Sequence, residues 1–421
     1  MPRPYGKMQS LLARTKTFLT PSGSSTNLLE AGKFRTEKDA SSLFTQTDPN
    51  IDGDDCLHDC ASCTEALPRK WSIDEDDKLY GHVKGWETHL VIGTGKTDWV
   101  RDVTDEKGSL MQAVGKLGVE LANGKLMLSA SDMPTSSDCG TVHDAWDSSD
   151  AKKGTEYGNE GKTRCLLLPR WEMVEGVGVN EAQWLLEDVI SKSSTNSTPL
   201  SKERVTKTQV VESSEVTQGE MVVQKEQEPG IEDAPDVNGL SIHDKPQNGA
   251  PQDGPSSGTI LTTHQEKSSS SIPAGVTMKP CPHRAVILMC SHGTRDWRCG
   301  KSAPILKREL ERHLRPLGLY RDFDDERPGG VGIYFINHVG GHKYSANVMI
   351  YRRAGEKRGG ANGEIYDGSL SSEAVQGIWL ARVRPEDCEN IVKYTVLQGK
   401  LVKPQRQLRG GFDRERGVLS W

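Results

Sequence analysis

The chain has 421 residues, a formal net charge of −6 and nine cysteines. This length allows two or three domains, each large enough to bury a core. No window approaches the roughly 18 consecutive apolar residues of a membrane span, so we expect no membrane partner. An odd number of cysteines, without an apolar signal-peptide core at the start, favours free or metal-bound thiols in a reducing compartment over a disulfide scaffold.

The charge is unevenly distributed along the chain. Residues 279–421 carry 25 Lys and Arg against 16 Asp and Glu, whereas the remainder is acidic. A basic surface of this kind can dock an acidic redox partner or a nucleic acid, or it can simply be solvated. Nothing else in the sequence favours a nucleic acid, and we expect none as a partner.

Residues 1–54 lack hydrophobic periodicity and predict a disordered leader. The first 29 residues contain four basic side chains, several Ser and Thr, and no acidic side chain, which is the composition of a mitochondrial transit peptide. A solvated basic leader has a similar composition. The mitochondrion is therefore an alternative to the cytoplasm as the location.

Residues 55–192 predict an N-terminal α/β domain, because strand-like and helix-like runs alternate. THLVIGTG, KLMLSAS and TRCLLLPRW favour strands, whereas KGSLMQAVGKLGVEL and NEAQWLLEDVISK favour amphipathic helices. The run GTGKT at 93–97 resembles a phosphate-binding loop. Such a loop needs a glycine at the position that Leu90 occupies, so we do not expect nucleotide binding.

Residues 193–279 are rich in Ser, Thr, Glu, Gln, Pro and Gly and predict a long disordered linker. Residues 280–421 predict a second folded region, in which HRAVILM, VGIYFIN and ANVMIYR favour strands. KSAPILKRELERHLRPLGL favours a helix with Ser302 as its N-cap and Pro304 in its first turn. The order of elements suits a small mixed sheet with helices on its faces. No tandem repeat of fixed period is evident.

Three cysteines of this second region offer two pairs with the same spacing. Residues 283–289 favour a strand, which would hold Cys281 and Cys290 about 20 Å apart and prevent them from sharing a metal cofactor. Cys290 and Cys299, in contrast, are joined by the polar run SHGTRDWR, which can fold back. We therefore predict Cys290 and Cys299 as the pair of thiol ligands.

His338 and His342 supply the second half of the predicted site, in the loop HVGGH at the end of another strand. The two glycines between them allow a tight turn, so that both imidazoles can converge. His283, His292 and His313 are weaker candidates, expected at the surface or behind the ligands.

Two thiolates and two imidazoles can bind zinc or a [2Fe–2S] cluster. The C-x8-C spacing is wider than the usual x2–4 spacing of zinc sites, whereas a two-iron cluster tolerates wider loops. Two Cys and two His are also the ligands of Rieske clusters, whose potentials are about −150 to +300 mV, against about −400 mV for all-cysteine plant-type ferredoxins. Rieske domains, however, arrange these ligands as C-x-H and C-x-x-H.

The motifs CSHGTRDWRCGKSAP and HVGGHKYSANVMIY resemble the sucrase/ferredoxin-like family, in particular its actin patches distal and altered inheritance of mitochondria branches. GWETHLVIGTGKTDWVRDV and QGIWLARVRPEDCENIVKYTVLQGK are similar to that family as well. The resemblance implies a C-terminal thioredoxin-like ferredoxin domain with a bis-histidinyl [2Fe–2S] cluster on Cys290, Cys299, His338 and His342. It also implies electron transfer in redox homeostasis with a redox partner such as a flavin reductase, and an electron carrier rather than a catalyst with its own substrate. A zinc-stabilised interaction module without redox activity is the alternative.

Cys56-x3-Cys60-x2-Cys63 has the cysteine spacing of radical SAM enzymes. The context differs, because no strand precedes the motif and no barrel of sufficient length follows it. A second metal site and a redox pair of Cys60 and Cys63 are both open at this point, beside free structural thiols.

The last three residues, Leu419, Ser420 and Trp421, resemble the C-terminal signal that recruits the cytosolic iron–sulfur assembly machinery. This resemblance favours the cytoplasm as the location. The alternative is that Trp421 merely anchors the tail on the domain.

Overall fold

The computed structural model describes residues 34–118, 120–135, 161–200, 271–353 and 372–421. The predicted transit peptide and most of the predicted linker lie outside these residues. The described residues up to 200 and from 272 onward belong to one compact unit. Within the described part of the chain, no helix has the length and apolar character needed to cross a membrane.

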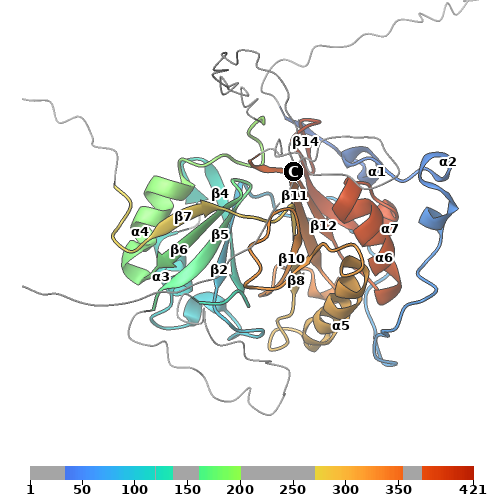
Figure 1. The fold of residues 1–421 in the computed structure, drawn as a ribbon, viewed down its shortest axis with the longest axis horizontal. Coiled ribbons are helices and arrows are strands. Elements are labelled where there is room, and N and C mark those ends of the chain that lie inside the picture. Colours follow the sequence, from blue (N-terminus) through green and yellow to red (C-terminus); the bar gives the residue numbers. More distant parts are fainter. Residues whose placement is uncertain (1–33, 119, 136–160, 201–270, 354–371) are drawn as a thin grey trace, which may run out of the picture. The chain divides into compact units, whose positions relative to one another are not determined.

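Fourteen strands of the described residues form one mixed sheet (Figure 1). Along the sheet the order is β1-β14-β13-β12-β11-β8-β10-β4-β2-β5-β6-β7, with β3 paired to β4 and β9 paired to β10. The strands are β1 (Arg35–Thr36), β2 (Thr88–Gly93), β3 (Glu120–Leu121), β4 (Gly124–Ser131), β5 (Thr163–Leu168), β6 (Glu172–Val177), β7 (Thr277–Pro280), β8 (Ala285–Cys290), β9 (Tyr320–Arg321), β10 (Val331–Ile336), β11 (Val348–Arg353), β12 (Ala374–Leu380), β13 (Leu408–Asp413) and β14 (Val418–Leu419).

Most helices of the described residues are short, and one is much longer than the others. They are α1 (Ala40–Leu43), α2 (Pro49–Asp52), α3 (Leu110–Leu117), α4 (Ala182–Trp184), α5 (Trp297–Leu314), α6 (Cys388–Asn390) and α7 (Pro404–Gln407). α4 and α6 each continue into a π-helical turn, at Leu185–Ile190 and Ile391–Val396. The structure is thus mixed α/β with a large sheet, which confirms the predicted class in this coarser form.

The long helix α5 begins earlier than the sequence predicts. Its N-cap is Asp296, whose side chain accepts a hydrogen bond from the first turn. Ser302 is buried within the helix and is not the N-cap, and Pro304 lies in the helix interior. The physical reason is that Asp296, which lies outside the predicted range, caps the helix. The helix therefore starts at Trp297, well before Pro304. As a consequence Cys299 lies in the first turn of α5 and not in a loop.

Two parts of the chain repeat one order of elements. We call residues 88–190 the N-terminal half and residues 285–396 the C-terminal half. Apart from the short β3 and β9, the first contains β2-α3-β4-β5-β6-α4 and the second β8-α5-β10-β11-β12-α6. In both, the strands around the first helix are parallel, and the third strand runs antiparallel to the first and the fourth.

The two halves meet at equivalent strands, β4 and β10. These strands pair antiparallel through Ser131 and Ile336. Strands predicted for two separate domains, 55–192 and 280–421, therefore belong to one sheet and one compact unit. A single α/β unit replaces the two-domain arrangement in the described residues.

Both faces of the central strands are buried, which explains their continuous apolar runs. In β8, Ile287 and Met289 pack in the cluster that contains the helices, whereas Val286 and Leu288 pack on the opposite face. That opposite face is covered by large aromatic side chains, namely Trp86, Trp171, Tyr351, Trp379 and Phe412. The alternation of successive side chains follows from the period of two along a strand.

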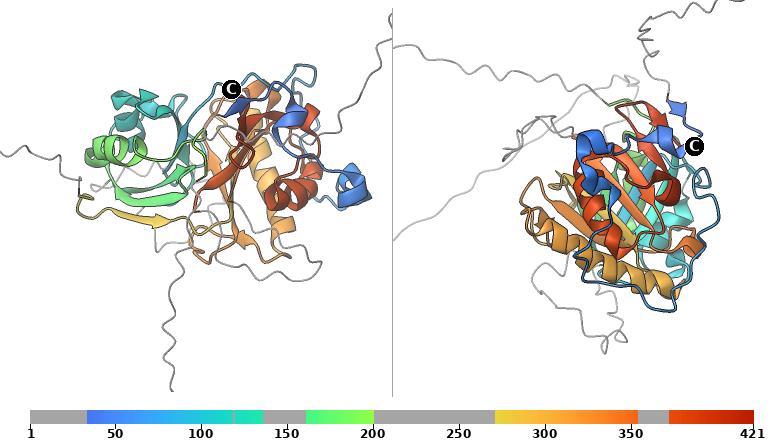
Figure 2. Two further views of the ribbon diagram at one scale, coloured as in Figure 1. Left: turned by 90° about the horizontal axis from the view of Figure 1, so that it is seen from above. Right: turned by 90° about the vertical axis from the view of Figure 1, so that its right-hand side faces the viewer.

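Residues 34–54 are folded, so the disordered leader predicted for residues 1–54 is wrong over this part of its range. Leu43 and Phe44 are buried against the C-terminal elements, and Figure 2 shows this blue segment beside the red ones. The apolar pair lay in a polar stretch without periodicity, which is why sequence reasoning missed it. Likewise β7 and the residues around 195 belong to the folded unit and shorten the predicted linker at both ends.

The C-terminal tail is packed into the fold. Leu419 lies in β14, which pairs with β13 and β1. The Trp421 ring lies on the Trp86 ring, with 4.5 Å between centroids, and the Thr36 hydroxyl donates to the Trp421 carbonyl oxygen. The tail thus has the anchoring role that the sequence left open as an alternative.

Candidate metal centre

The four predicted ligands come from two parallel strands and from the helix between them. Cys290 is the last residue of β8, and His338 follows the end of β10 by two residues. Cys299 lies in the first turn of α5, which connects these strands, and His342 begins a short turn after β10. Because β8 and β10 are parallel neighbours, their carboxyl ends bring the four residues to one edge of the sheet.

The two thiols are both buried. Cys290 is 1 % exposed and Cys299 is 0 % exposed. The interaction with the Cys299 thiol lowers the pKa of the Cys290 thiol, although burial opposes the shift, and the interaction with His338 contributes further. The interaction with Cys290, together with burial, raises the pKa of Cys299. The pair thus loses its first proton more readily than an isolated buried thiol does, and the thiolate is the form that binds metals.

The two imidazoles lie next to each other, and His338 is partly buried whereas His342 is exposed. The ring centroids of His338 and His342 are 5.3 Å apart. Nδ1 of His338 is buried and has no hydrogen-bond partner among the described residues. A buried nitrogen of this kind is costly unless a proton donor or a metal ion satisfies it. Acidic thiol, neighbouring imidazoles and unsatisfied nitrogen together fit a metal cofactor at this position.

Two glycines and Arg409 shape the histidine loop. The φ angles of Gly340 and Gly341 are 89° and 69°, a backbone region in which glycine is favoured. Arg409 donates from Nη1 to the carbonyl oxygen of Gly340 at 3.0 Å. Its guanidinium also lies over the ring of Trp379, 4.3 Å from the centroid. The loop therefore rests on a buried cation that is itself held by an aromatic ring.

Asn347 connects the histidine loop to the thiol side. Its carbonyl oxygen accepts from the Cys290 amide at 3.1 Å, and its Nδ2 donates to the Gly341 carbonyl oxygen at 3.3 Å. Its Oδ1 accepts from Arg409 Nη1 at 2.7 Å. Sequence reasoning missed both Asn347 and Arg409. A polar residue directly before the apolar run VMIY was the signal for Asn347, and nothing near Arg409 in the sequence marks it.

The N-terminal half supports the loop between the two cysteines. The Ser291 hydroxyl donates to the Thr97 carbonyl oxygen at 2.6 Å. The Asp98 carboxylate accepts from the amide and from the hydroxyl of Thr294, at 3.0 and 2.8 Å. The run GTGKT and the residues after it, rejected as a nucleotide site, thus pack against the thiol loop.

The imidazole of His292 is buried, and its hydrogen bonds leave it unable to bind a metal ion. Its Nδ1 accepts from the His338 amide at 3.2 Å, and its Nε2 donates to the Trp99 carbonyl oxygen at 3.0 Å. Both ring nitrogens are used, so neither has a lone pair for a metal. His283, the next weaker candidate, is bonded to the Tyr334 hydroxyl at 2.8 Å.

Cys281 lies at the far end of β8 from Cys290, as the sequence predicts. It precedes the strand, is 1 % exposed, and has its pKa raised to about 12 by burial. A second group of metal-binding side chains lies elsewhere. Within the described residues, the one group with all ligand atoms within 4.8 Å of one another is Cys60, Glu309 and His313.

The sucrase/ferredoxin-like family model matches residues 79–410, most of the chain and both halves of the sheet. The chain belongs to the sucrase/ferredoxin-like family. Actin patches distal protein 1 of Saccharomyces cerevisiae is 42 % identical over 114 residues, which cover 27 % of this chain and 30 % of that protein.

Altered inheritance of mitochondria protein 32 is a second similar protein. The protein of Meyerozyma guilliermondii is 32 % identical over 135 residues, 32 % of this chain and 35 % of its own length. That of Debaryomyces hansenii is 35 % identical over 118 residues, 28 % and 33 %. The matches thus span only about a third of each relative. No solved structure matches the chain significantly.

Proposed function

We propose that Cys290, Cys299, His338 and His342 hold a [2Fe–2S] cluster and that the protein transfers electrons. The observation that carries the proposal is the meeting of two buried thiols with two adjacent imidazoles at one edge of the sheet. When bound, such a cluster supplies one-electron redox chemistry at a potential raised by its imidazole ligands. Membership of the sucrase/ferredoxin-like family supports this reading.

The spread of the four ligands favours a cluster over a single zinc ion. Around zinc, with Zn–S of about 2.3 Å and Zn–N of about 2.0 Å, tetrahedral ligand atoms lie about 3.3 to 3.8 Å apart. Among the described residues, no three of these four ligand atoms all lie within 4.8 Å of one another. A two-iron cofactor needs the wider arrangement, because each iron takes its own pair of ligands.

The topology of the C-terminal half supports the thioredoxin-like part of the proposal. The unit β8-α5-β10 is followed by β11 and β12, and the strands lie in the order β12-β11-β8-β10. β11 runs antiparallel to both neighbours, and α6 follows β12. This mixed sheet with one crossover helix and one C-terminal helix is what a thioredoxin-like ferredoxin requires.

The protein's own residues have different roles around the proposed cofactor. The buried thiols exclude water from one side, and their mutual interaction lowers the pKa of Cys290 and so favours the thiolate that binds metals. The partly exposed imidazoles form the side on which a partner can approach. Arg409, with its guanidinium against the histidine loop, places a positive charge next to a cofactor that gains negative charge on reduction.

A carrier of electrons needs a donor and an acceptor, and we propose a redox partner protein, with a flavin reductase as donor. Delivery of the cluster by the cytosolic iron–sulfur assembly machinery, through Leu419, Ser420 and Trp421, belongs to the same proposal. Because these residues are packed, recruitment would require the tail to leave Trp86. The cytoplasm is the proposed location, with the mitochondrion as the alternative.

Electron paramagnetic resonance of protein purified without oxygen tests the function. We expect a reddish-brown protein that gives a signal of a reduced [2Fe–2S] cluster after one electron is added. His338→Cys should keep a cluster and lower its reduction potential, because a thiolate stabilises the oxidised form. A colourless, signal-free protein would refute the proposal, and an unchanged potential in His338→Cys would remove His338 from the ligands.

A further inference from the structure

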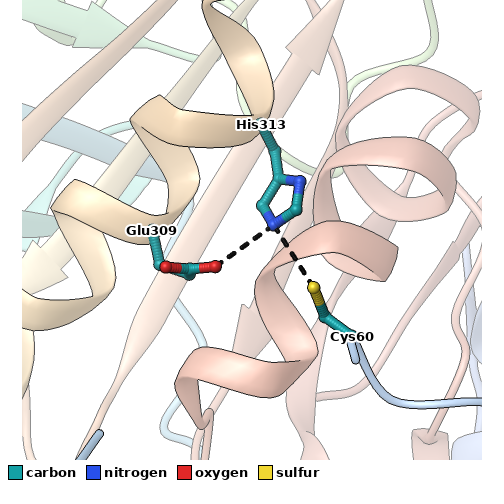
Figure 3. Close-up of side chains that lie close together, drawn as sticks. All are labelled: Cys60, Glu309 and His313. Atoms are coloured by element: carbon teal, nitrogen blue, oxygen red, sulfur yellow. Dashed lines mark hydrogen bonds and ion pairs between the residues drawn. The ribbon is translucent and has the colours of Figure 1, made fainter. Parts of the chain in front are cut away.

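Three potential metal ligands meet at the carboxyl-terminal part of α5, away from the residues described above (Figure 3). Glu309 and His313 are separated by one turn and lie on the same face of the helix, and Cys60 reaches them from the N-terminal segment. Cys60 Sγ is 3.8 Å from His313 Nε2, which is 3.3 Å from Glu309 Oε1. The side chain of Glu309 is fully buried, unlike the acidic groups that gather on surfaces without a ligand.

The distances in this group match a tetrahedral metal site. With a Zn–S bond of about 2.3 Å and Zn–N and Zn–O bonds of about 2.0 Å, the edges of a tetrahedron are about 3.6 Å for S–N and about 3.3 Å for N–O. The observed separations are 3.8 and 3.3 Å. Sulfur, imidazole nitrogen and carboxylate oxygen form a donor set that zinc accepts.

A cation already sits among the three ligand atoms, namely the Arg312 guanidinium. Its Nη2 lies 3.0 Å from His313 Nε2 and 3.5 Å from Cys60 Sγ, and its Nε donates to Glu309 Oε1 at 2.9 Å. Because Nη2 donates, His313 Nε2 presents a lone pair, as a metal ligand must. Burial, followed by the charge of Arg312, lowers the pKa of His313, which disfavours the protonated imidazole. The Arg312 side chain is 33 % exposed and has room to move toward solvent.

Cys63 is the fourth ligand that the group requires. It follows Cys60 with the C-x2-C spacing that is usual for zinc. Burial raises the pKa of the Cys63 thiol, and the charge of Glu309 acts in the same direction. The Cys63 thiol donates to the Glu65 carbonyl oxygen at 3.2 Å, a bond that ligation of a metal ion would replace.

We propose that Cys60, Cys63, Glu309 and His313 form a site for a zinc-class divalent ion, which enters as Arg312 moves out and the thiols release their protons to solvent. The ion joins the N-terminal segment to α5. This site is distinct from the proposed cluster site. Cys299 and His313 lie on the same helix 14 residues apart, which corresponds to about 21 Å at about 1.5 Å per residue.

Zinc content, measured together with iron and sulfide in the full-length protein, tests the proposal. We expect one zinc per chain in the wild type and its loss in Cys60→Ser and in His313→Gln, with iron and sulfide unchanged. His58→Gln is the matched control, since this exposed histidine lies in the same segment, and it should keep the zinc. Zinc that is absent from the wild type, or that leaves on Cys290→Ser and not on Cys60→Ser, would overturn the proposal.

Arg312→Gln provides a test that does not depend on removing a ligand. If zinc competes with the guanidinium, the variant should bind added Zn²⁺ about tenfold more tightly, corresponding to about 1.4 kcal/mol for the lost charged hydrogen bonds. Its melting temperature should rise on addition of Zn²⁺ and fall with a chelator, because Glu309 is otherwise buried without a cation. If Arg312 is instead the permanent partner of Glu309, the variant will be less stable and will not respond to Zn²⁺, and the proposal fails.

Discussion

The N-terminal and C-terminal halves share one order of strands and helices, yet they carry different types of side chain at equivalent positions. β2 and β8 are both six residues long and both pair in parallel with the strand that follows the crossover helix. The C-terminal half ends its strand with Cys290, and the N-terminal half ends its strand with Gly93. Two positions after the Asp-Trp pair, Cys299 in one half corresponds to Arg101 in the other.

The difference shows that the fold forms the edge of the sheet, whereas a few side chains determine whether that edge can bind a cofactor or only supports its neighbour. In the C-terminal half the edge gathers thiols and imidazoles. In the N-terminal half the same edge supplies Thr97 and Asp98, which hold the thiol loop of its neighbour. One copy of the fold thus bears the proposed cofactor and the other supports it.

The largest expected effect comes from a thiol that has no counterpart in the N-terminal half. Cys290→Ser should abolish cluster binding, because a serine oxygen at the buried end of β8 cannot replace the acidic thiolate. Iron and visible absorption of anaerobically purified protein measure the loss. Cys281→Ser is the control at the other end of the strand and should retain the cluster; equal loss in both variants would mean that the effect is only structural.

Gly341→Ala should destabilise the histidine loop more than Gly340→Ala. Both glycines have positive φ, so each substitution costs about 1 kcal/mol of backbone strain. A Cβ at Gly341 would also lie 2.6 Å from the Arg409 guanidinium, whereas a Cβ at Gly340 meets no atom within 4 Å.

We therefore expect Gly341→Ala to lose about 1–2 kcal/mol more of the free energy of unfolding than Gly340→Ala, and to bind iron less completely. Denaturant unfolding and iron analysis of the two variants side by side measure this. Equal losses would show that Arg409 does not shape the loop.

The junction of the halves should make stability depend on pH through Asp132. Burial raises the pKa of this carboxyl group to about 7, and its Oδ1 accepts from the Phe335 amide at 2.8 Å. The folded protein then binds the proton more tightly than the unfolded chain does. The stabilisation is complete below the unfolded value of 3.8 and is lost as the pH rises through about 7.

Asp132→Asn keeps the hydrogen-bond acceptor and cannot titrate. Between about pH 5 and pH 8 the wild type should lose about 2 kcal/mol of unfolding free energy relative to this variant. Unfolding curves at several pH values measure the difference. Parallel pH profiles for the two proteins would contradict the assignment.

The smallest expected effect tests the support that one half gives the other. Asp98→Ala removes the hydrogen bonds with the amide and hydroxyl of Thr294. Because the Asp98 side chain is 46 % exposed, water replaces part of the lost bonding, and we expect a cost of about 1 kcal/mol. The cluster should also be lost faster in a chelator. A loss rate equal to that of the wild type would mean that Asp98 does not stabilise the loop between the two cysteines.

The sequence predicts that the four candidate ligands come together, because they stand near the ends of recognisable strands, with distinctive spacing within each pair. Strand ends and the HVGGH turn are local features, and parallel pairing of β8 and β10 then brings them together. Arg409 and Asn347 were not predictable in this way. Arg409 contributes through a strand far along the chain, and its contact with Gly340 exists only once the sheet has formed.

The Cys60 group and the repeated halves illustrate the same limit. Glu309 and His313 read as an ordinary charged helix face, and only folding brings Cys60 to them. The sequence does not reveal the two halves, because they share the order of their strands and helices and not a repeat of fixed length in residues. Their joining in one sheet rests on a short pairing between Ser131 and Ile336, which no local pattern reveals.

The most direct test of the central claim is the ratio of iron to acid-labile sulfide in the protein purified without oxygen. The account predicts two iron atoms and two sulfides per chain, retained in Cys60→Ser and lost in Cys290→Ser. A protein with no sulfide, whose metal is a single zinc bound by Cys290, Cys299, His338 and His342, would contradict it.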